Sequence, residues 1–269
     1  MSQLLPNQLH GQVQHVFKKS INLELNGKMI HVGSDPVKLS SFGCVPDADT
    51  LNIILEKVSP GDLVTYQNQI LRLYGREIIT LNLSQFEEID LSLPSCNTSC
   101  HDIIEALLLV FRGKEFYKHI GILKDDKFQR HADALRQSRT LQDGQTLEAV
   151  RYFVGRGAGL TPSGDDLLTG FLIALKWYAC SEAFEFILYQ VGFHQTTAVS
   201  EAYLHAAMNG YISYPVKGML EASMSRDVDQ IKFWIDQISA LGHTSGYDLL
   251  LGIKYGLEHI QRRIKHGTS

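Results

Sequence analysis

Polar side chains and glycines that could bind a ligand are crowded into one segment, GRGAGLTPSGDD, which runs from Gly155 to Asp166. Its glycines allow positive φ and let bare amide groups approach a ligand closely. Hydroxyls and a pair of carboxylates follow, directly before an apolar run that predicts a helix. A helix N-terminus with free amides attracts negative charge, so the segment predicts a site for a small anion such as a carboxylate or phosphate. The residues expected to bind it are Gly155, Arg156, Gly157, Gly159, Thr161, Ser163, Gly164 and Asp166.

The two neighbouring carboxylates of this segment are expected to have different roles. Ser163 and Asp166 have the spacing of a capping box at the start of the helix, which gives Asp166 a structural task. Asp165 remains, and we expect it to be the catalytic or ligand-holding carboxylate. The alternative is that Asp165 only complements the helix dipole. Known phosphate loops are excluded, because residues 146–154 read as helix rather than strand and no Gly-Lys-Ser/Thr follows.

A second copy of the motif follows 82 residues later. The first copy reads SGDDLLTG from Ser163, and the second reads SGYDLLLG from Ser245. Two such helix N-termini could converge on one pocket, to which the second copy would contribute His243, Thr244, Ser245, Gly246 and Asp248. Alternatively, any two capped Leu-rich helices look alike. The glycine that closes both copies is best explained by close helix packing.

The elements that must position these residues change character along the chain. From Gly11 to about Leu93 the sequence alternates like an antiparallel sheet, and Asn26-Gly27 is a strong hairpin signal. Near Pro94 the apolar period changes to that of helices, which then recur to about Lys265. We therefore predict an α+β fold with a β-rich domain over residues 1–95 and a helical domain over residues 96–269.

Composition excludes several classes of function. The 269 residues carry 25 basic and 29 acidic side chains, so the chain lacks the positive surface that nucleic-acid binding requires. No apolar stretch approaches the roughly 20 residues that span a bilayer. The cysteines form no disulfide framework and no secretory leader precedes them, which predicts free thiols and a cytoplasmic location. No metal ligand pair stands out among the histidines, and no cofactor can be named.

The motifs also resemble a known family. GRGAGLTPSGDDLLTGFL, TTAVSEAYLHAAMNG and GHTSGYDLLLGI look like the AllH-type subunit of oxamate carbamoyltransferase and its uncharacterised relatives. The likeness extends to GQVQHVFKKSINLEL and GREIITLNLS near the start. Ala158 departs from the Pro of many relatives, and Leu167 from a common Phe; both changes leave the polar set intact.

The resemblance implies a setting and partners. It implies an enzyme subunit that works with FdrA-like and AllG-type subunits in carbamoyl transfer between oxamate and carbamoyl phosphate during allantoin breakdown. The family's catalytic residues are not settled, so no role is carried over onto Asp165 or Ser163. Three functions stay open: an enzyme subunit that holds a small anionic metabolite, a binding module without a catalytic group, and a structural subunit whose glycines only allow close packing.

Overall fold

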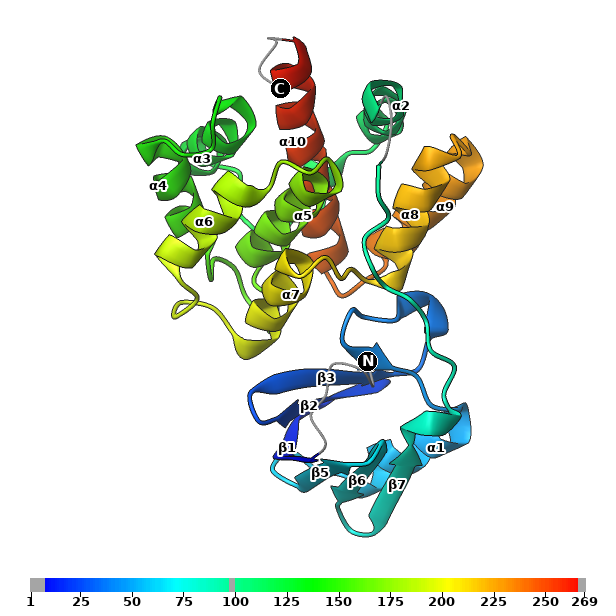
Figure 1. The fold of residues 1–269 in the computed structure, drawn as a ribbon. Helices are drawn as coiled ribbons and strands as arrows, with labels where there is room; N and C mark the ends of the chain where they lie inside the picture. The colour runs from blue at the N-terminus through cyan, green and yellow to red at the C-terminus, as the bar shows by residue number, and fades with distance from the viewer. Residues whose placement is uncertain (1–7, 97–99, 266–269) are drawn as a thin grey trace. The chain divides into compact units, whose positions relative to one another are not determined.

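The computed structural model of the chain describes residues 8–96 and 100–265. The chain divides into two compact units, Met1–Leu91 and Ser92–Ser269. The first holds the β-strands and the second is helical (Figure 1). The α+β class predicted from the sequence is confirmed.

The first unit is built on one seven-stranded sheet within the described residues. Its strand order is β4-β3-β2-β1-β5-β6-β7, with β3 and β4 parallel and the other neighbours antiparallel. The strands are β1 (Gln8–Val16), β2 (Ser20–Leu25), β3 (Lys28–Gly33), β4 (Gly43–Cys44), β5 (Leu63–Gln67), β6 (Ile70–Tyr74) and β7 (Ile78–Asn82). Short 3-10 helices occupy Pro36–Lys38 and Leu83–Gln85.

Two tight turns set the register of this sheet. Asn26 and Gly27 have φ of 49° and 79°, so the predicted hairpin between β2 and β3 has the turn expected for Asn-Gly. Asn68 and Gln69 make an equivalent turn between β5 and β6, with φ of 50° and 64°. Helix α1 (Ala48–Lys57) begins at Asp47, whose carboxylate accepts the Thr50 amide at 2.8 Å. It contributes apolar side chains to the same core as the sheet.

The second unit contains nine α-helices in its described part. They are α2 (Cys100–Arg112), α3 (Asp126–Gln137), α4 (Gly144–Phe153), α5 (Ser163–Trp177), α6 (Glu182–Val191), α7 (Ala198–Met208), α8 (Tyr214–Met224), α9 (Val228–Ser239) and α10 (Ser245–Lys265). Every helix expected from the apolar period is present. No helix in the described ranges is long and apolar enough to cross a membrane.

Helices α5 and α10 lie side by side in the centre of the second unit (Figure 1). Their contact is reciprocal: a Cβ on Gly170 would lie 2.1 Å from the Leu249 carbonyl oxygen, and a Cβ on Gly252 would lie 2.0 Å from that of Leu167. Gly252 and Leu249 stand 82 residues after Gly170 and Leu167, so the two copies of the motif contact each other through equivalent positions. The glycines therefore let two backbones touch where any side chain would separate them.

The cysteines require a correction. Cys96 is disulfide-bonded, so the prediction that all thiols are free is wrong at this position. Cys44 and Cys180 are free. The prediction of free thiols was based on the absence of a disulfide framework, and a single disulfide needs no such framework.

Candidate functional site

The start of α5 differs from the predicted capping box. Pro162 is the N-cap residue and provides no capping side chain. Its carbonyl oxygen accepts the amides of Asp165 and Asp166 at 2.9 and 3.1 Å. The prediction that Ser163 caps the helix with Asp166 as its partner is therefore wrong. Because Ser163 already lies inside the helix, the side chains of Ser163 and Asp166 do not cap it.

Asp165 holds the glycine loop in place. Its Oδ1 accepts the Gly155 amide at 2.8 Å and its Oδ2 accepts the Thr196 hydroxyl. The residue is 1% exposed, and burial raises the pKa of its carboxyl, while the hydrogen bonds from Thr196 and Gly155 oppose the rise. The Gly155 amide, expected to face an anion, is thus occupied by a carboxylate of the chain itself.

The start of α10 is tied to a loop that the sequence did not single out. Asp248 is 1% exposed and accepts the Gly121 amide at 3.1 Å through Oδ1 and 3.4 Å through Oδ2. Burial raises the pKa of Asp248 to about 6, and the hydroxyls of Ser163 and Thr244 act in the opposite direction. No pattern around Gly121 marks it, because its partner lies 127 residues away.

Hydroxyl groups join the two helix ends directly. Thr161 Oγ1 and Ser245 Oγ lie 2.7 Å apart, and Ser163 Oγ and Thr244 Oγ1 lie 3.4 Å apart. A Cβ on Gly121 would come within 2.1 Å of Ser163 Oγ, so the loop packs its bare backbone against these hydroxyls. The two copies of the motif and the Gly121 loop therefore meet at one place.

Asp166 is the third carboxylate at this junction. The residue is partly exposed, but its Oδ2 is buried and accepts no hydrogen bond within the described part of the chain. Burial raises the pKa of Asp166 well above its ordinary value, the negative charges of Asp248 and Asp165 raise it further, and the hydroxyls of Ser245 and Thr161 lower it. A buried carboxylate oxygen without a donor favours either a proton or a ligand that supplies one.

Arg156, Gly159 and His243 were also predicted to be site residues. The Arg156 guanidinium lies 3.9 Å from the centre of the Tyr152 ring, and its Nε donates to the Tyr152 carbonyl at 2.7 Å. Gly159 has φ of 91° with open space around it, and His243 is exposed. Arg156 therefore lies against α4.

Gly157, Gly164 and Gly246 serve the packing of the backbone. Gly157 has φ of 125°, and a Cβ there would lie 2.6 Å from the Ser163 amide nitrogen. Cβ atoms on Gly164 and Gly246 would lie 2.0 and 1.8 Å from carbonyl oxygens at the ends of α4 and α9. The first turn of α5 thus packs against the end of α4, and the first turn of α10 packs against the end of α9.

Thr196 and Thr197 lie directly before α7. Thr197 does cap α7, by accepting the Ser200 amide at 3.1 Å, and it also donates to the Leu160 carbonyl. Thr196 instead donates to Asp165. Both threonines therefore fix the segment that leads into α5.

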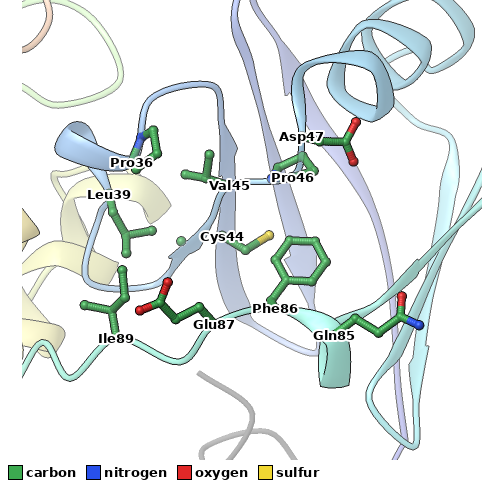
Figure 2. Close-up of a pocket in the computed structure, with 11 residues that line it drawn as sticks. Pro36, Leu39, Cys44, Val45, Pro46, Asp47, Gln85, Phe86, Glu87 and Ile89 are labelled. Carbon is green, nitrogen blue, oxygen red and sulfur yellow. The ribbon is translucent and has the colours of Figure 1, made fainter.

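The first unit has a pocket of its own, with a volume of about 490 Å³ (Figure 2). Its lining is mainly apolar, and it includes Asp47 and Glu87 but no basic side chain. Cys44 also lines it, and its thiol points toward the Phe86 ring (Figure 2). None of these residues was predicted from the sequence to be a site residue.

The Cys44 thiol is expected to react slowly in the folded protein. Burial raises its pKa to about 12, so almost no thiolate exists at neutral pH. Alkylation by iodoacetamide at pH 8, followed by mass spectrometry, should modify Cys44 about tenfold or more slowly in the native chain than in the unfolded chain. Equal rates in the two states would contradict this.

No cluster of three or more His, Cys, Asp or Glu side chains suited to a metal ion occurs in the described ranges. The polar junction is made of hydroxyls, carboxylates and backbone amides from α5, α10 and the Gly121 loop.

Comparison with known protein families gives a match to the segment that contains this junction. Residues 153–257 match the family model of oxamate carbamoyltransferase subunit AllH. The expected resemblance to AllH-type subunits is confirmed over this segment, which contains both helix ends. No solved structure matches the chain.

Proposed function

We propose that this chain is a subunit of an oxamate carbamoyltransferase-type enzyme and that the junction of α5 and α10 holds a small carboxylate or amide substrate. In the reaction, the nitrogen of oxamate bonds to the carbamoyl carbon and the carbon–oxygen bond to phosphate breaks. One proton leaves the nitrogen, so the products are carbamoylated oxamate and phosphate. The setting would be allantoin-type nitrogen catabolism in the cytoplasm.

The observation that carries this proposal is the meeting of both motif copies inside the segment that matches the AllH family. Two helix N-termini orient their dipoles toward one place, where they favour a carboxylate or a carbonyl oxygen. The hydroxyls of Thr161, Ser163, Thr244 and Ser245 can donate to such oxygens or accept from an amide. This arrangement suits the orientation of a small planar group during transfer.

The test needs the partner subunits. The chain is purified together with FdrA-like and AllG-type subunits, and phosphate release from carbamoyl phosphate is followed with and without oxamate. We expect oxamate-dependent release that requires this chain. Full activity of the partners without it would contradict the proposal.

A matched pair of variants locates the activity. Gly121→Ala places a methyl group 2.1 Å from Ser163 Oγ, whereas Gly113→Ala meets only the Val110 carbonyl at 3.7 Å. We expect Gly121→Ala to reduce turnover about tenfold and Gly113→Ala to leave it unchanged, because a misplaced positioning group costs rate steeply. Melting temperatures of both variants show whether either has lost its fold.

A non-catalytic subunit is the second candidate. It is favoured by the reciprocal glycine contacts and by the two carboxylates that already bind backbone amides, all of which a packing role would explain. In that case the chain would be needed for assembly, and Gly121→Ala would reduce the yield of complex without changing the turnover of the complex that forms.

A further inference from the structure

We propose that the pocket of the first unit binds a small organic cation, an ammonium group carried on an apolar body. The residues that line this pocket all belong to the unit Met1–Leu91, so that unit forms the site. The site is separate from the junction of α5 and α10, and the inference does not depend on the function proposed for that junction.

The pocket lies where the two edges of the sheet approach each other. The edge strands of the described sheet are β4 and β7. Gly43 and Cys44 of β4 line one side of the pocket, and residues 85–87 and Ile89, which follow β7, line the other (Figure 2). The open ends and seams of curled sheets are common places for small ligands, and the volume of about 490 Å³ suits one.

The lining places apolar surface between two carboxylates. In Figure 2, Leu39 and Ile89 lie beside Glu87. The Phe86 ring lies between Glu87 and Asp47 (Figure 2). An aromatic face attracts an ammonium group, and each methylene group that leaves water for such a lining gains about fourfold in affinity. The arrangement therefore fits a molecule that carries positive charge on an apolar body.

The charge of the lining decides the sign of the ligand. Asp47 and Glu87 line the pocket, and no basic side chain does. Hydrogen bonds from the amide and hydroxyl of Thr50 lower the pKa of Asp47, so this carboxylate is charged at neutral pH. Lys38 belongs to the 3-10 helix at the pocket wall but pairs with Asp35 at 3.9 Å. An anion would meet repulsion in this pocket, whereas an ammonium group would be attracted.

A hydroxyl without a partner lies directly behind the pocket wall. The Ser40 residue is 3% exposed, and its Oγ has no hydrogen-bond partner in the described part of the chain. A Cβ on Gly43 would come within 2.6 Å of this Oγ, so the hydroxyl lies against the bare backbone of a lining residue. A buried hydroxyl that lacks a partner favours a ligand with an N–H group that can donate to it.

Hexylammonium, 1-hexanol and hexanoate provide the comparison, because they share an apolar body and differ in the charge of the head group. Amide chemical shifts of the nitrogen-15-labelled full-length chain report the binding of each compound up to about 10 mM. Hexylammonium is expected to bind about tenfold more tightly than hexanol, and hexanoate more weakly than either. The amides that shift should be those of the pocket, including Cys44 and Phe86. This comparison needs no variant, so misfolding cannot confuse it.

Variants then assign the preference to the two carboxylates. Asp47→Asn removes one charge and keeps the cap of α1, because asparagine caps a helix about as well as aspartate. Glu87→Gln removes the other charge. Each variant should reduce the preference for hexylammonium over hexanol to about threefold. Asp125→Asn is the matched control, since Asp125 caps α3 through the Phe128 amide at 2.8 Å and does not line the pocket; it should keep the tenfold preference.

Three results would overturn the proposal. The first is that none of the three compounds shifts the pocket amides. The second is that hexanol binds as tightly as hexylammonium. The third is an unchanged preference in folded Asp47→Asn and Glu87→Gln. Oxamate, an anion, should leave the pocket amides unshifted, so the result does not depend on what the junction of α5 and α10 binds.

Discussion

Gly170→Ala and Gly252→Ala are each expected to lower the free energy of unfolding by about 3 kcal/mol, although alanine favours a helix by about 1 kcal/mol over glycine. Either Cβ would lie about 2 Å from a carbonyl oxygen of the facing helix. Backbone atoms cannot rotate away as a flexible side chain can, so α5 and α10 must separate. Urea unfolding followed by circular dichroism measures the change.

Gly144→Ala is the matched control for this result. Gly144 also lies in a helix, at the start of α4, but a Cβ there meets nothing within 4 Å. We expect this variant to be as stable as the wild type or slightly more so. The double variant Gly170→Ala/Gly252→Ala should lose less than the sum of the single losses, because one separation of the helices relieves both clashes. Single variants that unfold like Gly144→Ala would show that the helices are not in this close contact.

His259 is expected to make the protein sensitive to mild acid. It is fully buried in α10, and burial lowers its pKa to about 4; the positive charge of Arg263 adds to the effect and the Leu135 backbone opposes it. The unfolded chain takes up this proton below pH 6.5, whereas the native chain takes it up only near pH 4. The contribution of His259 to stability therefore falls as the pH drops between these values, by about 3 kcal/mol.

The measurement compares unfolding free energies at several pH values between 7 and 4 for wild type and His259→Leu. The variant should lose this part of the pH dependence, whatever its stability at pH 7. Leu257→Ala, a buried change on the same helix that removes no titrating group, should be less stable at every pH with the wild-type slope. Asp248 acts in the opposite direction, since its raised pKa favours the native state at low pH. Equal slopes in wild type and His259→Leu would contradict the prediction.

Much of the fold could be predicted from local signals. Asn26-Gly27 indicates its hairpin because both residues tolerate positive φ. The turn at Asn68 and Gln69 was missed because glutamine rarely adopts φ of 64° and carries no such signal. The strand order of the sheet depends on pairings between distant segments, which periodicity does not encode.

The candidate site was predictable only in part. The repeated motif indicated two similar helix ends, and the structure does bring Thr161, Ser163, Thr244 and Ser245 together. The roles of the carboxylates depend on Thr196 and Gly121, which lie 31 and 127 residues from their partners. Helix α5 also begins one residue earlier than the predicted capping box requires. Pro162 is its N-cap residue, so Ser163 and Asp166 have no capping role.

The reciprocal contact of α5 and α10 gives one polypeptide the geometry of a symmetric dimer, without the constraint that both halves share a sequence. A homodimer must change both halves at once, whereas this chain can change one. The two copies differ at one such position, where the first carries Asp165 and the second carries Tyr247. The Tyr247 ring stacks on that of His119, with centroids 4.5 Å apart. The two sides of the junction are therefore chemically different.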